Sequence, residues 1–256
     1  MKGLKSKITG KGPNLVLLHG WSMNSEVWQP VLPLLEGSFT VHRIDLPGHG
    51  INADCFPGDR LEDWAGAAVS VIPASSIVIG WSLGGLLALA IARHNPACIT
   101  RLGLIGCSPK FTADTDWPHA VPADLLDEFG AGLNEADDKT VKRFIKLVAL
   151  GDPGAVQLSR RLQSIVNRNA QAIMPALRAG LRLLRDEDLR QIFRGLARPL
   201  WVALGDADRL VPVEVVAGLV QLNETVRIDV FENCGHIPFM SYPEMFVRRM
   251  RSWLGE

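Results

Sequence analysis

Short apolar runs alternate along the chain with longer segments in which apolar residues recur at helical spacing. Candidate strands are N-L-V-L-L-H from residue 14, T-V-H-R-I-D from 40, S-I-V-I-G from 76, R-L-G-L-I-G from 101, L-W-V-A-L-G from 200 and V-R-I-D-V-F from 226. Several are apolar throughout, which is typical of parallel strands covered on both faces. The alternation of such strands with helices predicts an α/β fold with a doubly wound, mostly parallel sheet.

The stretch between the runs at 101 and 200 has a different character. From near Phe111 to near Gly195 it contains several helical patterns and almost no strand pattern. A chain of 256 residues that is 47% hydrophobic is long enough to form one α/β domain with a large core. We therefore predict a core made of residues 1–110 and 196–256 that carries an inserted helical cap, residues 111–195.

Composition narrows the classes of function. Lys+Arg and Asp+Glu both number 27, so the overall charge favours no polyanionic partner such as a nucleic acid. The longest apolar run, residues 77–92, falls short of the ~20 residues that a membrane span needs. The basic N-terminus lacks the apolar stretch of a signal peptide, and the four cysteines lack CxxC spacing, which favours reduced thiols. We expect a cytoplasmic protein without a membrane partner.

The pentapeptide G-W-S-L-G, residues 80–84, joins the run at 76 to the helical pattern L-L-A-L-A-I-A. Ser82 thus lies at the carboxyl end of a strand, where open parallel sheets bind their ligands. Gly80 and Gly84 remove side chains that would collide in a tight strand-to-helix turn, which holds the serine in a strained, exposed conformation. This pattern predicts that Ser82 is a nucleophile.

A serine nucleophile needs a base to take its proton, and an acid must orient that base. His236, in N-C-G-H-I-P after the last predicted strand, is the candidate base. The strand at 200 ends in G-D-A-D-R-L-V-P, which offers Asp206 and Asp208, and only one of them can orient the histidine. We favour Asp208 and keep Asp206 as the alternative. Asp45 is a weaker rival because it precedes the serine.

Acyl transfer also requires backbone N–H donors where negative charge develops. Leu83, directly after the nucleophile, would supply one donor at a helix N-terminus. The second is expected from Trp21, in the loop H-G-W-S-M after the strand at 14, and its indole would also line the acyl pocket. The alternative for Trp21 is a packing aromatic. His19 and Gly20 are expected to shape this loop.

Five motifs together, L-L-H-G-W, D-L-P-G-H-G, G-W-S-L-G-G, G-D-A-D-R-L-V-P and C-G-H-I-P-F, resemble the α/β-hydrolase superfamily over nearly the whole chain. The resemblance implies the order serine, acid, histidine, and the D-x-x-V-P spacing favours Asp208. Within the superfamily, H-G-W-S-M-N-S-E-V-W, W-S-L-G-G-L, C-S-P-K-F-T-A-D-T-D-W-P and T-V-K-R-F are similar to the biotin-pathway carboxylesterases. This implies an enzyme that hydrolyses the methyl ester of pimeloyl-acyl carrier protein to methanol and a free carboxylate. No metal and no cofactor is expected, and we expect a monomer.

The predicted cap carries a local excess of positive charge. Between residues 139 and 185 there is one acid, Asp152, against ten basic residues: Lys139, Lys142, Arg143, Lys146, Arg160, Arg161, Arg168, Arg178, Arg182 and Arg185. The whole insert balances at twelve of each sign. The spacing of the first four cations places them on one helix face, where a stripe without acidic neighbours repels itself.

An acyl carrier protein is strongly acidic, so a basic cap is what its docking requires. We predict a docking surface formed by Lys139, Lys142, Arg143 and Arg160. The alternative is an ordinary solvated helix face.

The other faces of the helix that begins at 139 carry apolar residues. Phe144, Leu147 and Val148 are candidates for lining an acyl tunnel, and the predicted substrate-binding segment includes the intervening Ile145 and Lys146. The alternative for these side chains is packing of the cap onto the core.

Two other functions remain open. One is a general carboxylesterase for small free esters, in which the basic cap is only surface. The other is a binding protein that uses the pocket without chemistry, although such a protein has no need of serine, acid and histidine together. The sequence after the serine lacks the glycines of a dinucleotide or phosphate loop.

Overall fold

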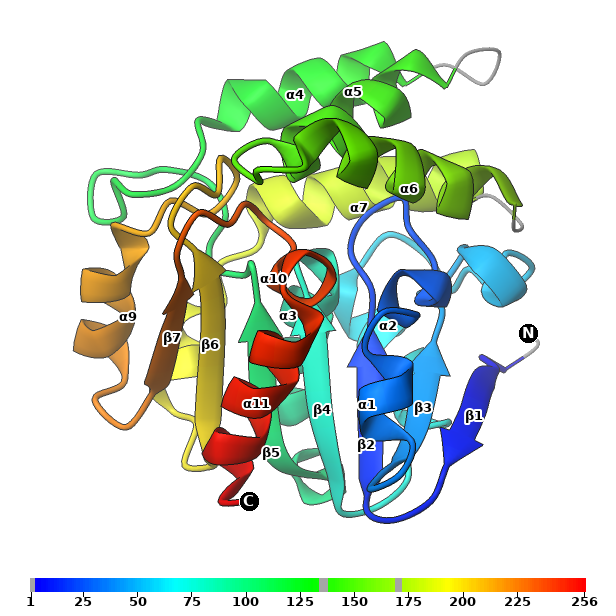
Figure 1. Ribbon diagram of the computed structural model, residues 1–256. Helices are drawn as coiled ribbons and strands as arrows, with labels where there is room; N and C mark the ends of the chain where they lie inside the picture. Colours follow the sequence, from blue (N-terminus) through cyan, green and yellow to red (C-terminus); the bar gives the residue numbers. More distant parts are fainter. Residues whose placement is uncertain (1–2, 134–137, 169–171) are drawn as a thin grey trace.

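The computed structural model describes residues 3–133, 138–168 and 172–256 (Figure 1). Within these ranges a seven-stranded sheet has the order β1-β3-β2-β4-β5-β6-β7. Its strands are β1 (Ser6–Gly10), β2 (Asn14–Leu18), β3 (Thr40–Ile44), β4 (Ser76–Trp81), β5 (Ile99–Ile105), β6 (Leu200–Gly205) and β7 (Arg227–Phe231). β1 pairs antiparallel with β3, and the other described pairings are parallel. The predicted doubly wound, mostly parallel sheet is confirmed.

All six strands expected from apolar runs are present, and β4 and β6 are buried along their whole length. The edge strand β1 was not expected. Its sequence S-K-I-T-G has one large apolar residue, Ile8, which is 57% exposed. A short, lysine-bearing edge strand needs no continuous apolar run, because one of its faces remains in water.

Helices cover both faces of the sheet. The core helices are α1 (Leu32–Leu35), α2 (Leu61–Val69), α3 (Leu83–His94), α9 (Val215–Leu222), α10 (Pro238–Ser241) and α11 (Pro243–Leu254), with 3₁₀ turns at Ser25–Trp28, Gly50–Asn52 and Pro96–Cys98. Figure 1 shows α1 and α11 in front of the sheet and α2 and α3 behind it. This arrangement buries the apolar strands on both sides and leaves their carboxyl ends for the site.

The segment between β5 and β6 begins with an irregular stretch, and its described parts after that are mostly helical. It contains α4 (Ala123–Gly132), α5 (Lys139–Ala149), α6 (Ala155–Arg168), α7 (Met174–Asp186) and α8 (Arg190–Arg194). In Figure 1, α4 to α7 lie above the carboxyl ends of the strands, with α4 packed on α7 and α5 on α6. The last helix, α8, packs instead on the core helices α3 and α9. The bounds 111–195 for the cap remain a prediction.

Cys55, Cys98, Cys107 and Cys234 are all buried and free, which agrees with the expectation of reduced thiols. No helix in the described ranges is long and apolar enough to cross a membrane. The described residues also contain no group of three or more His, Cys, Asp or Glu side chains with the geometry of a metal site.

Candidate active site

Ser82 lies in the turn between β4 and α3, at the carboxyl edge of the sheet. Its backbone has φ 55° and ψ −121°, in a region that non-glycine residues rarely adopt. The Ser82 N–H donates to the carbonyl of Ile105 on the neighbouring strand β5 at 2.9 Å. Strained backbone persists where surrounding contacts hold it, and such positions cluster at functional sites. The turn has the geometry of a nucleophile elbow.

The tightness of this turn depends on Gly84. A Cβ atom at this position would lie 2.5 Å from the carbonyl oxygens of Leu18 and His19 at the end of β2. No side chain fits such a gap. The absence of a Cβ therefore lets α3 start directly against β2, which brings Ser82 next to the loop that follows that strand.

Asp208 and His236 form a buried pair at the ends of β6 and β7. Oδ2 of Asp208 accepts a hydrogen bond from Nδ1 of His236 at 2.7 Å, and both side chains are almost fully buried. Oδ1 of Asp208 accepts the N–H groups of Leu210 and Val211 at 2.8 and 3.1 Å. The carboxylate is thus held from both sides, and with a proton on Nδ1 the other nitrogen of the ring is left unprotonated to act as a base.

Nε2 of His236 is buried and makes no hydrogen bond with any described residue. A general base needs such an unoccupied nitrogen, and its bond to the nucleophile is often long until substrate binds. The ring lies beside Gly106 (φ 48°), where a Cβ would come within 2.9 Å of Nδ1 of His236. Glycine at this position therefore leaves room for the imidazole against the end of β5.

The two rival acids lie elsewhere. Oδ1 of Asp206, which is exposed, accepts the N–H of Cys234 at 3.2 Å. Both oxygens of the buried Asp45 accept backbone N–H groups, from Ser25 and from Ile51. Asp45 therefore fixes the turns after β2 and β3, and of the three carboxylates only Asp208 has a described hydrogen bond with His236.

Trp81, which precedes the serine, was not singled out from the sequence. Its indole Nε1 donates to the carbonyl of His236 at 3.0 Å, and the two rings lie 5.8 Å apart. The end of β4 is thus tied directly to the histidine loop. The only sequence signal was a tryptophan in the second position of the G-W-S-L-G motif.

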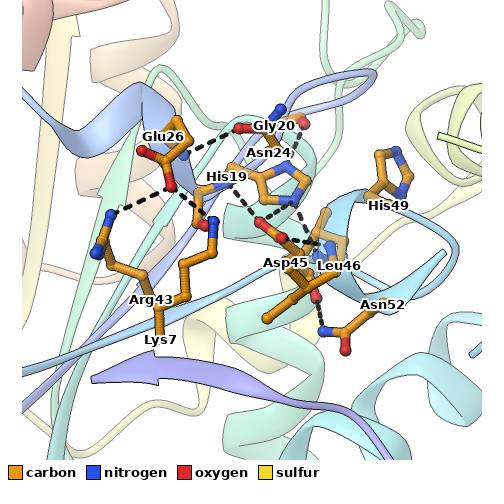
Figure 2. A network of polar contacts seen from close by, with 12 residues as sticks. Lys7, His19, Gly20, Asn24, Glu26, Arg43, Asp45, Leu46, His49 and Asn52 are labelled. Carbon is orange, nitrogen blue, oxygen red and sulfur yellow. Dashed lines mark hydrogen bonds and ion pairs between the residues drawn. The ribbon is translucent and has the colours of Figure 1, made fainter. Parts of the chain in front are cut away.

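His19 anchors the loop that carries Trp21 (Figure 2). Its Nδ1–H donates to the carbonyl of Gly20 at 2.8 Å, and its Nε2 accepts the N–H of Leu46 at 2.9 Å. These two roles require the neutral ring. Burial also lowers the pKa of His19. The histidine is an uncharged link between the loops after β2 and β3, which is consistent with the expected shaping role.

Trp21 joins this loop to the cap. Its indole Nε1 donates to the carbonyl of Leu177 on α7 at 2.8 Å. Its ring meets that of Phe144 on α5 edge to face, with centroids 4.7 Å apart. The indole therefore packs between the core and the cap. This position is compatible with both expected roles of Trp21, a packing aromatic and a wall of the acyl pocket.

The segment 144–148 divides between two sides of α5. Phe144, Ile145 and Val148 are buried, and Leu147 is half-buried. Lys146 is exposed and lines a surface groove together with Arg160 of α6. Two residues along a helix turn the side chain to the other side, so the structure does not bring Lys146 to the face that carries Phe144.

The predicted docking residues Lys139, Lys142, Arg143 and Arg160 are all exposed. The expectation that the α5 stripe has no acidic neighbours is wrong. Lys142 pairs with Asp138 at 2.8 Å, and Arg143 pairs with Glu128 of α4 at 2.9 Å. Both acids lie outside the window of residues 139 to 185, in which the excess charge was counted. An exposed ion pair contributes only about 0–1 kcal/mol to stability. Lys142 and Arg143 can therefore leave these acids and pair with another acidic partner at little cost.

His49 is buried as well, and its ring lies 5.3 Å from that of His19. Nδ1 donates to the carbonyl of Pro47 at 2.8 Å, whereas Nε2 has no partner among the described residues. Burial lowers the pKa of His49 from 6.5 to about 3. Between these two values the unfolded chain binds a proton at this position that the folded chain does not.

Acid should therefore destabilise the fold through His49. Because the unfolded state binds more protons, this group alone lowers the free energy of unfolding by about 1.4 kcal/mol per pH unit of acidification. His49→Asn keeps a donor near Pro47 and removes the titrating group. The free energy of unfolding, measured with urea, should therefore change less steeply with pH between about pH 6 and pH 4 in this variant than in the wild type. His94→Asn, at an exposed histidine, is the control. An unchanged slope in His49→Asn would show that His49 binds protons alike in both states.

A sequence model described as the alpha/beta hydrolase family matches residues 15–249. The pimeloyl-[acyl-carrier protein] methyl ester esterase of Pseudoalteromonas atlantica is 39% identical over 247 residues, which cover 95% of each chain. The protein of the same name from Methylococcus capsulatus is 36% identical over 252 residues, which cover 98% of each chain.

Two solved structures share the fold. An esterase from Exiguobacterium antarcticum superimposes with a TM-score of 0.88 at 22% identity, over 99% of this chain and 96% of its own. A bromoperoxidase from Bacillus anthracis gives 0.89 at 16% identity, over 99% of this chain and 95% of its own. At these identities the likeness concerns the fold alone.

Proposed function

Because the chain belongs to the alpha/beta hydrolase family, we propose that it is a serine carboxylesterase that hydrolyses the methyl ester of pimeloyl-acyl carrier protein in biotin biosynthesis. The observation that carries the esterase chemistry is the buried Asp208–His236 pair, which Trp81 ties to the strained Ser82 turn. The substrate is supported by full-length relatives named for this reaction. The products are methanol and the free carboxylate, still attached to the carrier at its other end.

Ser82 would attack the ester carbonyl while Nε2 of His236 takes the hydroxyl proton. Asp208 holds the ring and stabilises the imidazolium that forms. When the tetrahedral intermediate collapses, His236 gives its proton to the departing methoxide, which leaves as methanol. Water then attacks the acyl-enzyme by the same route, and the carboxylate is released.

The oxyanion of the intermediate would be held by two backbone N–H groups. Leu83 is the first residue of α3, so its N–H has no acceptor one turn earlier in the helix, and it lies at the positive end of the helix dipole. Trp21 would supply the second N–H from the loop that His19 anchors. Removing one such donor typically costs about 10²–10³ in kcat.

The acyl chain would lie between this loop and the cap. Trp21 and Phe144 meet there, and Ile145 lines an adjoining cavity together with Leu177. Val148 and Leu147 extend the apolar face of α5. Apolar walls suit the methylene groups of a dicarboxylic acyl chain, because they remove these groups from water.

The carrier protein would dock on the exposed cations Lys139, Lys142, Arg143 and Arg160. An acidic partner would replace Asp138 and Glu128 as the counter-charge of Lys142 and Arg143. We further propose that the enzyme acts as a cytoplasmic monomer.

Reversing charge on this surface tests the substrate. The double variant Arg143→Glu, Arg160→Glu should lower kcat/KM for the carrier-bound methyl ester by about tenfold or more, since electrostatic steering governs encounter. Added salt should weaken the same reaction in the wild type, because the Debye length shrinks from ~10 Å at 0.1 M to ~3 Å at 1 M. Both effects are to be measured against a small free methyl ester, which shares the triad but not the docking surface.

A matched control reverses two exposed cations of the core, Lys11→Glu in the β1–β2 turn and Arg248→Glu on α11. It changes the net charge equally, on two elements that belong to the core and not to the cap (Figure 1). If the cap variant, the core variant and salt affect carrier-bound and free esters alike, the cap is an ordinary solvated surface. The general carboxylesterase would then replace the carrier-specific enzyme.

A further inference from the structure

Ser22 combines two unfavourable features. It follows Trp21 in the loop after β2, and its backbone has φ 61°, a left-handed conformation that costs energy for any residue with a Cβ. The side chain is only 3% exposed, and Oγ makes no hydrogen bond with any described residue. A buried hydroxyl without a partner is destabilising, and each such case in a folded protein calls for an explanation.

Ser22 lines a cavity between the core loop and the cap helices α5, α6 and α7. The buried walls beside Ser22 are apolar and come from Ile145, Val166 and Leu177. Toward solvent the lining becomes polar, with the exposed side chains of Lys142 and Asn167. The cavity is linked to Trp21 through Leu177, which lines it and whose carbonyl accepts the Trp21 indole N–H.

A dicarboxylic acyl chain has two carbonyl groups separated by methylenes. This step rests on the proposed function, in which the Trp21 and Leu83 N–H groups serve the carbonyl under attack. The far carbonyl would then enter the apolar part of the cavity, where a carbonyl without a hydrogen-bond donor is costly. Ser22 lines this cavity, and its hydroxyl is a donor that has no described partner.

We propose that Ser22 donates a hydrogen bond to the far carbonyl of the acyl chain, and that it thereby selects dicarboxylic over monocarboxylic substrates. In the carrier-bound substrate this acceptor is the thioester carbonyl, and in a free diester it is the second ester carbonyl. The bond also makes chain length matter, because O–H···O geometry is satisfied only over a narrow range of distances.

The test compares two small esters that need no carrier. Dimethyl pimelate and methyl heptanoate have acyl chains of equal length, but only the first has a far carbonyl. In Ser22→Ala the ratio of their kcat/KM values should fall by about threefold to tenfold relative to wild type. Using the ratio cancels any general damage to the site.

Ser22→Gly is the second variant, since glycine adopts a positive φ without strain. It should lower the ratio as much as alanine does while raising Tm. The comparison thus separates the effect of the hydroxyl on specificity from the effect of backbone strain on stability. Across dimethyl adipate, pimelate and suberate, wild type should show a preferred length and both variants a flatter dependence. An unchanged ratio in both variants overturns the proposal.

This outcome is distinct from failure of the proposed function. All of these esters are free, so the result does not depend on docking of a carrier protein. Loss of the carrier preference would refute the carrier-bound substrate and leave the role of Ser22 intact. An unchanged ester ratio would refute Ser22 and leave the carrier reaction intact.

Discussion

Ser82→Ala is expected to reduce kcat for methyl ester hydrolysis by on the order of 10⁶, because the triad acts as a unit and without the hydroxyl no acyl-enzyme forms. The variant keeps a Cβ and changes no described backbone hydrogen bond of the turn, including that from the Ser82 N–H to Ile105. The fold should therefore persist, as checked by thermal unfolding of the same purified sample.

Ser76→Ala is the matched control for this experiment. Ser76 is a buried serine at the other end of β4, where its hydroxyl donates to the carbonyl of Pro73. Losing that bond costs about 1 kcal/mol of stability and should leave ester hydrolysis near the wild-type rate. Near-wild-type activity in Ser82→Ala would instead place the nucleophile elsewhere and end the serine mechanism.

The strands and the serine turn were predictable because their signals are local. Strands covered on both faces must be apolar throughout, and a strand-to-helix turn that meets β2 so closely must have glycine at Gly84. The order of strand ends along the chain also pointed to His236 and to the neighbouring Asp206 and Asp208, between which the D-x-x-V-P spacing favoured Asp208. The edge strand β1 was not predicted, because a strand with one exposed face has too few apolar residues to form a recognisable apolar run.

The supports of the site were not predictable, because their partners are distant in sequence. Trp81 bonds to the carbonyl of His236, 155 residues away, and His19 accepts the N–H of Leu46, 27 residues away. The acidic partner of Arg143 comes from another helix, so counting charges within one window missed Glu128. Motif spacing predicts which groups react, whereas the contacts that hold these groups follow only from the packed fold.

Asp208→Asn is expected to lower kcat by about 10⁴, the loss typical when a triad histidine is held in the wrong tautomer. The surroundings dictate how the new amide must lie. Leu210 and Val211 both direct N–H groups at Oδ1, so the amide oxygen has to stay there. The NH₂ group then faces Nδ1 of His236 in place of Oδ2. A donor at this position requires Nδ1 to be the acceptor, which puts the ring proton on Nε2, and a protonated Nε2 cannot take the proton of Ser82.

Asp206→Asn is the comparison that decides between the two acids. Its Oδ1 accepts one N–H, from Cys234 at 3.2 Å, and an asparagine oxygen can accept the same bond. We therefore expect kcat within about threefold of wild type, because this single, partly buried hydrogen bond can be kept. The two variants are isosteric with wild type and lose the same charge, so any large difference in kcat reflects position alone. If Asp206→Asn is the inactive one and Asp208→Asn is mild, the base is oriented from Asp206, and the hydrogen bond between Asp208 and His236 is structural.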